Sequence, residues 1–119
     1  MISGFRIRAG LAVLAASLGA IHGAVAADAA RGKTLFTQKY GCFQCHGTEG
    51  QGSAATGPKL APGPLPYEAL SSFIRTSSRN MPPYREQVLP EADLQDIYAY
   101  LQSIKPAPDW KSIPLLANQ

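Results

Sequence analysis

Cysteine, histidine and methionine are scarce in this chain of 119 residues, which contains only two of each. These six residues are Cys42, Cys45, His22, His46, Met1 and Met81. So few cysteines exclude a disulfide framework, and so few histidines leave any metal site a small choice of ligands. Internal repeats and the alternating apolar pattern of strands are also absent. These absences predict a helical chain whose core is not held by disulfides.

Long apolar runs are missing as well. The run over residues 9–21 is shorter than the roughly 20 residues that a membrane-spanning helix needs. It follows the basic residues Arg6 and Arg8 and precedes the small residues 24–26. This order is typical of a secretory signal peptide, which we predict over residues 1–26, with cleavage after Ala26 or, as a second choice, Ala27. An uncleaved membrane anchor is the alternative.

A large excess of one charge is missing too. The chain has 11 Lys and Arg against 8 Asp and Glu, and loss of Arg6 and Arg8 with the signal peptide would leave 9 against 8. Such a balance gives no reason to expect a nucleic-acid partner, and any charge used for docking must be a local patch.

The chemistry that is present lies in Cys42-Phe43-Gln44-Cys45-His46. Cys-x-x-Cys-His is the attachment motif of c-type haem. The two thiols add to the vinyl groups of the porphyrin, and the adjacent imidazole becomes the proximal ligand of the iron. We therefore predict one covalent haem c per chain, bound through Cys42 and Cys45, with His46 as a metal ligand.

Two other interpretations of this motif are possible. A redox-active dithiol of the thioredoxin type would need a strand–helix–strand context, which the sequence does not show. A zinc site would need further Cys or His ligands, and residues 27–119 contain none beyond the motif.

Met81 is the second predicted metal ligand. It is the one methionine left in residues 27–119, and it lies in a polar segment that Pro82 and Pro83 keep from continuing as a helix. The alternatives are a methionine of the core, a vacant axial position, or ligation by a lysine or a tyrosine.

Helix signals divide the remainder of the chain. Asp28 is a good N-cap for a helix over residues 29–39, and Pro66 and Pro90 can begin helices that end near residues 76 and 105. Residues 47–66 are rich in glycine and proline and read as a loop. We expect a haem domain over residues 27–105 and an extended, proline-rich tail over residues 106–119.

Several further motifs follow one another in a recognisable order. They are Gly32-x-x-x-Phe36, Cys42-x-x-Cys45-His46, Gly57-Pro58-x-Leu60, Met81 and Tyr100-Leu101. Over residues 28–105 this order resembles the class I cytochrome c family in its short bacterial periplasmic form. The resemblance implies an all-α cytochrome c fold, with the first and last helices crossing and the haem enclosed by loops.

The resemblance also implies roles for individual residues. Gly32 would lie at the helix crossing and face residues 97–101. The carbonyl of Pro58 would accept a hydrogen bond from the ring of His46, and Leu60 would pack on the haem beside it. The candidates to contact the haem propionates are Arg75, Arg79 and Tyr67.

The function implied is that of a one-electron carrier and not of an enzyme. The chain resembles cytochrome subunits that accompany periplasmic dehydrogenases, so we expect a dehydrogenase as electron donor and an oxidase or another cytochrome as acceptor. A periplasmic location follows from the predicted signal peptide, with no stable membrane insertion after cleavage. The alternative is a haem enzyme or a gas-binding module with an open or displaceable axial position.

Overall fold

The structure is a computed structural model that describes residues 26–117 of the chain. The predicted signal peptide, apart from Ala26, lies outside the described residues. Within the described range the chain forms helices and no strand, with one isolated bridge between Ser53 and Gly57. The elements are α1 (Ala29–Thr34), η1 (Leu35–Lys39), α2 (Phe43–His46), α3 (Tyr67–Thr76), α4 (Glu91–Ser103), η2 (Trp110–Ser112) and α5 (Pro114–Ala117). The predicted all-α fold class is confirmed.

Helix α1 begins at an N-cap and continues directly into η1. The Asp28 carboxylate accepts hydrogen bonds from two backbone N–H groups of the first turn, at 2.8 and 3.1 Å. Together α1 and η1 cover the predicted helix over residues 29–39. In η1, however, the Tyr40 N–H bonds to the Leu35 carbonyl at 2.9 Å, five residues back instead of four. The predicted helix over residues 29–39 is therefore present, and its second half, residues 35–39, is a wider π-helical turn.

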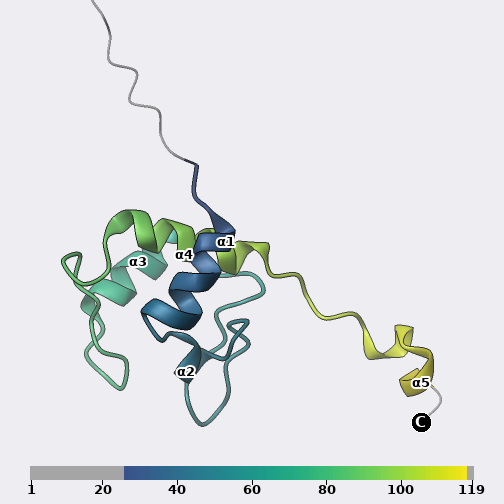
Figure 1. Cartoon of the computed structure of the whole chain (residues 1–119). Helices are drawn as coiled ribbons and strands as arrows, with labels where there is room; N and C mark the ends of the chain where they lie inside the picture. Colours follow the sequence, from purple (N-terminus) through teal and green to yellow (C-terminus); the bar gives the residue numbers. More distant parts are fainter. Residues whose placement is uncertain (1–25, 118–119) are drawn as a thin grey trace, which may run out of the picture.

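Helices α1 and α4 cross at Gly32 (Figure 1). A methyl group on Gly32 would collide with the backbone carbonyl of Asp96 and lie 3.0 Å from the nitrogen of Ile97. Only glycine leaves room for this approach. The predicted crossing of the first and last helices is confirmed. The contact lies on the Asp96–Ile97 peptide, at the N-terminal edge of the segment 97–101 that the sequence indicated.

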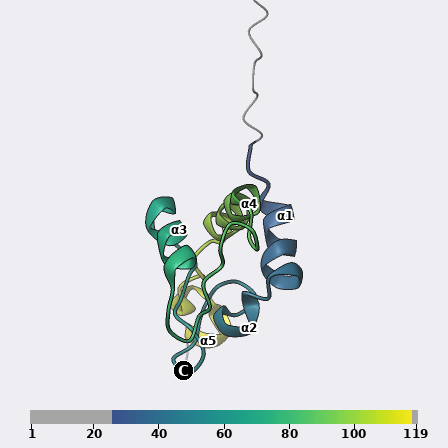
Figure 2. The same ribbon diagram turned by 90° about the vertical axis from the view of Figure 1, so that its left-hand side faces the viewer.

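The apolar core joins these two helices to α3 and to the long loops. Figure 2 shows α4 between α1 and α3. The buried core residues are Leu35, Phe36, Ala61, Leu70, Leu89, Leu94, Ile97, Tyr100 and Leu101. Ala61 and Leu89 belong to loops, so the loops are packed into the core and do not merely connect the helices.

The C-terminal part departs from the prediction in two places. Helix α4 ends at Ser103 and not at Lys105, because Ile104 is already extended and Pro106 disfavours a helical conformation in the residue before it. The tail over residues 106–119 is also not extended throughout, since it contains the short turns η2 and α5. None of the helices in residues 26–117 has the length and apolar character that crossing a membrane requires.

Candidate haem site

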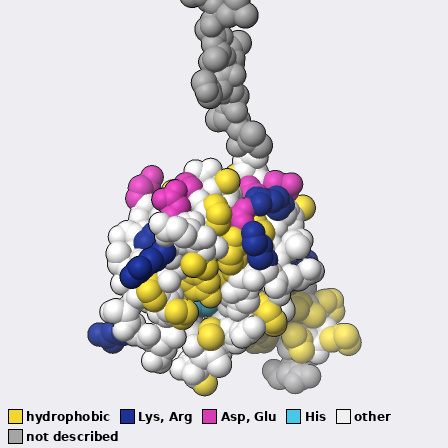
Figure 3. Space-filling view, turned by 60° about the vertical axis from the view of Figure 1, so that its left-hand side comes forward, with side chains coloured by type: hydrophobic (Ala, Val, Ile, Leu, Met, Phe, Trp, Pro, Cys, Tyr) yellow, Lys and Arg dark blue, Asp and Glu magenta, His cyan; other side chains and the backbone are white. Residues whose placement is uncertain are grey.

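One cavity of about 890 Å³ is lined by all six residues that the sequence predicts to bind the haem or its iron. These lining residues are Cys42, Cys45, His46, Pro58, Leu60 and Met81. They come from α2 and its N-cap, from the loop over residues 47–66, and from the loop between α3 and α4. Leu70 of α3 and Ile97 of α4 also line the cavity. Figure 3 shows hydrophobic side chains gathered around a hollow in which a histidine side chain is visible.

The short helix α2 positions His46. Its turn begins at Cys42, whose carbonyl accepts a hydrogen bond from the His46 N–H at 3.1 Å, so the cysteines and the histidine are fixed within one turn. The imidazole is 7% exposed, and its Nδ1 lies 2.8 Å from the carbonyl oxygen of Pro58. A carbonyl oxygen only accepts, so Nδ1 carries the proton and the lone pair of Nε2 is available to a metal.

The loop over residues 47–66 closes tightly over α2. The hydroxyl of Thr56 donates to the Cys45 carbonyl at 2.7 Å, and the Gly52 N–H donates to the His46 carbonyl at 2.8 Å. A methyl group on Gly57 would lie 3.0 Å from the Cys45 carbonyl oxygen and 3.2 Å from the imidazole. Glycine at this position therefore lets the backbone that precedes Pro58 lie against the histidine ring.

The environment of Cys42 differs from that of a redox-active thiol. Cys42 is half-buried, and burial raises the pKa of its thiol to about 11. Redox-active Cys-x-x-Cys pairs instead have a lowered thiol pKa. In residues 26–117 no group of three His, Cys, Asp or Glu side chains is placed to hold a metal ion, so the structure gives the zinc interpretation no support.

Met81 is half-buried on a loop that its neighbours hold in place. The hydroxyl of Ser77 donates to the backbone carbonyl of Met81 at 2.9 Å, and Ser77 is itself buried. Pro82 and Pro83 follow and restrict the backbone. The sequence could not predict this contact, because a serine that follows a helix gives no indication that its hydroxyl bonds to a backbone carbonyl four residues later.

Two of the three candidate propionate contacts have other partners. Arg75 donates to the carbonyls of Tyr84 and Leu89 and pairs with Glu91, and Tyr67 donates its hydroxyl to the same Glu91 carboxylate. The expectation that they face the haem propionates is therefore not supported for either residue. The third candidate, Arg79, is exposed and lines the cavity.

Residues 27–101 match the sequence profile of the family described as cytochrome c oxidase, cbb3-type, subunit III. The chain belongs to this cytochrome c family. As a cytochrome c it carries covalently bound haem c, and it is a haem electron carrier. The cavity fits that cofactor, since two thiols, an imidazole with a free nitrogen and a thioether all line one largely apolar space.

Known proteins similar to this cytochrome c are named cytochrome bc1 complex cytochrome c subunits. Those of Corynebacterium diphtheriae, Corynebacterium efficiens and Mycobacterium leprae are 34%, 31% and 30% identical over 84, 83 and 79 residues. The matches cover 69%, 68% and 65% of this chain but only 29%, 27% and 27% of those relatives. The chain thus spans less than a third of their length. No solved structure matches it.

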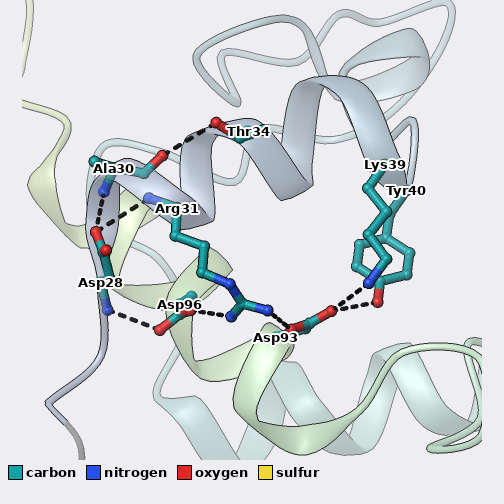
Figure 4. A network of polar contacts seen from close by, with 8 residues as sticks. All are labelled: Asp28, Ala30, Arg31, Thr34, Lys39, Tyr40, Asp93 and Asp96. Carbon is teal, nitrogen blue, oxygen red and sulfur yellow. Dashed lines mark hydrogen bonds and ion pairs between the residues drawn. The ribbon is translucent and has the colours of Figure 1, made fainter.

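A polar network that the sequence did not reveal joins the first and last helices of this cytochrome c (Figure 4). Asp93 and Asp96 of α4 are both buried, and both pair with Arg31 of α1. Asp93 also accepts from the Lys39 ammonium at 2.8 Å and from the Tyr40 hydroxyl at 2.6 Å. These contacts, that of Lys39 foremost, hold the pKa of the Asp93 carboxyl well below its usual range.

The sequence contains one partial indication of this network, the positions of the two aspartates in α4. Residues 93, 96, 97 and 100 share one helical face, so the two aspartates fall on the buried stripe that contains Ile97 and Tyr100. Asp93 also lies in the first turn of α4, where the helix N-terminus favours an anion whether or not it has a partner. The sequence could not predict the partners of Asp93, because they lie more than 50 positions away along the chain.

Proposed function

We propose that the protein is a periplasmic one-electron carrier in which Cys42 and Cys45 bind the haem while His46 and Met81 are its axial ligands. One observation carries this proposal. Residues 26–117 contain one histidine and one methionine, and both line the same cavity as the two cysteines. A shared haem site explains why these scarce residue types, from two segments 35 positions apart, meet in one cavity.

The chain's residues fit the demands of electron transfer. The bound haem supplies an iron centre that alternates between two oxidation states. The Pro58 carbonyl fixes the orientation of His46 and makes the imidazole a stronger ligand. Ser77 and the two prolines hold the backbone of Met81. Ligands that are held before and after the transfer need little rearrangement, and a thioether ligand raises the reduction potential.

The alternative of a haem enzyme or gas-binding module requires an open or easily vacated axial position. An enzyme of this kind also needs an acid–base group beside that position. Among the described lining residues of the cavity, His46 is the one histidine, and the Pro58 contact accounts for its second nitrogen. The presence of Met81 in the same cavity supports the carrier.

The surface around the cavity fits brief docking with redox proteins. Leu65 and Phe73 line the cavity and are 60% and 58% exposed. Lysine and arginine side chains flank the hydrophobic side chains on this face (Figure 3). We propose that a periplasmic dehydrogenase donates electrons and that an oxidase or another cytochrome accepts them.

A second candidate for the partner is a respiratory complex that holds this chain as a subunit. The relatives, which are named cytochrome bc1 complex cytochrome c subunits, favour it. Affinity purification of the full holoprotein from its own organism separates the two candidates. Co-purification of a dehydrogenase supports the first, and co-purification of a cytochrome bc1 complex supports the second. The same preparation tests export, because N-terminal sequencing should begin at Ala27.

Substitution of the proposed second ligand tests the site. We expect Met81→Ala to retain covalent haem and to lower the reduction potential by more than about 60 mV, a tenfold change in a one-electron equilibrium. Leu65→Ala, which alters another lining residue of the same cavity, should leave the potential nearly unchanged. The measurement is a spectroelectrochemical titration of the three holoproteins. An unchanged potential in Met81→Ala would remove Met81 from the iron.

A further inference from the structure

The loop that carries Met81 contains no helix or strand of its own. Residues 77–90 connect α3 to α4 as bends, a turn and extended chain. A loop of this kind samples many conformations unless other groups restrain it. An axial ligand on such a loop stays in place only as well as the loop does, so the restraints on this segment bear directly on the haem site.

The entry and the middle of the loop are attached to α3. At the entry, the Ser77 N–H donates to the Phe73 carbonyl at 2.9 Å, and the Ser77 hydroxyl donates to the Met81 carbonyl at 2.9 Å. In the middle, the Tyr84 N–H donates to the carbonyl of Ile74 at 2.9 Å. These bonds do not restrain the part of the loop between Tyr84 and α4.

Arg75 of α3 holds that segment. Its Nη1 donates to the Tyr84 carbonyl at 2.9 Å and to the Leu89 carbonyl at 2.5 Å, and its Nη2 lies 3.0 Å from the Glu91 carboxylate. The side chain is only 19% exposed, and Leu89 is buried. One planar guanidinium thus ties the middle of the loop, its end and the first residue of α4 to α3.

We infer that Arg75 is a positioning residue that keeps the Met81 loop closed and thereby protects the axial position from external ligands. This inference rests on the proposed ligation by Met81. Without the guanidinium, the two carbonyls lose a charged donor and the loop opens more often. A competing ligand binds only the open form, so its apparent affinity rises with the fraction of open loop.

Imidazole binding to the oxidised holoprotein measures this fraction. The absorption band from sulfur-to-iron charge transfer reports Met81 on the iron, and its loss during an imidazole titration gives the apparent affinity. We expect Arg75→Gln to raise the affinity for imidazole roughly tenfold or more. Arg75→Lys keeps the charge and some donors, so it should give a smaller rise. Arg85→Gln removes the same charge from an exposed side chain of the same loop and should behave as the native protein does.

Each result decides the matter. Equal affinities in Arg75→Gln and the native protein, or equal increases in Arg75→Gln and Arg85→Gln, would overturn the inference. If Arg75→Gln does not accumulate as folded holoprotein, Arg75→Lys replaces it, since loss of the planar guanidinium should raise the affinity in the same direction; no rise would overturn the inference. Absence of the charge-transfer band in the native protein would overturn Met81 ligation itself, and with it this inference.

Discussion

At the scale of single residues, Gly32 has no space for a side chain at the helix crossing. In an exposed helix, replacement of glycine by alanine stabilises by about 1 kcal/mol. Here the added methyl would collide with the Asp96 carbonyl, so we expect Gly32→Ala to lower the free energy of unfolding of the holoprotein by about 1–3 kcal/mol. Denaturant titration measures it. An unchanged or increased stability would show that α1 and α4 do not approach this closely.

A second prediction at this scale concerns the charge of Asp93. Its pKa in the folded protein is lower than in the unfolded chain, where it is about 3.9. The stability that its ionised form contributes is therefore fully present well above pH 4 and is lost as the pH falls below about 4. Asp93→Asn should lower the free energy of unfolding more at pH 7 than at pH 3, where part of this contribution is already lost.

Denaturant titrations of the holoprotein at both pH values provide the test. Glu86→Gln removes a charge from an exposed residue and serves as the control, with little expected change at either pH. Equal destabilisation by Asp93→Asn at pH 3 and pH 7 would contradict the assignment of the network in Figure 4 as a contact between ionised groups.

At the scale of elements, the C-terminal segment stands apart from the haem domain. Figure 1 shows α5 away from the crossed helices, and α5 packs against η2. Among the described residues, the side-chain hydrogen bonds of this segment stay within it: the Lys111 N–H donates to the Asp109 carboxylate, and the Ser112 hydroxyl donates to the Asp109 backbone carbonyl. Trp110 and Leu115 are exposed.

We therefore expect removal of residues 106–119 to change the free energy of unfolding of the holoprotein by less than about 0.5 kcal/mol. The reason is that none of residues 106–117 belongs to the buried core. Thermal and denaturant unfolding of the shortened and full holoproteins measure the difference. A loss of several kcal/mol would show that the segment packs on the haem domain.

The elements also show what the sequence could and could not predict. Asp28, Pro66 and Pro90 mark helix starts because caps act over a few neighbouring residues. The π-helical turn of η1 has no such local signal. The role of Arg75 was equally hidden, because its partners are backbone carbonyls of an irregular loop. The attachment motif was readable since its chemistry lies within five consecutive residues.

At the scale of the whole molecule, the core is small and encloses a large cavity. Nine buried apolar residues form the core, beside a cavity of about 890 Å³. An empty space of that size forfeits the packing contacts of its walls. The double variant Cys42→Ala/Cys45→Ala, which has no thiol to attach haem, should therefore lose most of its helical circular dichroism and become sensitive to protease. Native-like helicity and protease resistance in this variant would show that the fold does not depend on the haem.

Covalent attachment of the haem is the central claim, and intact-mass spectrometry of the denatured, exported protein after acid–acetone extraction tests it most directly. The predicted result is that the pigment stays with the polypeptide and that the mass equals residues 27–119 plus one haem. A polypeptide of unmodified mass, with the pigment in the acetone, would contradict the account.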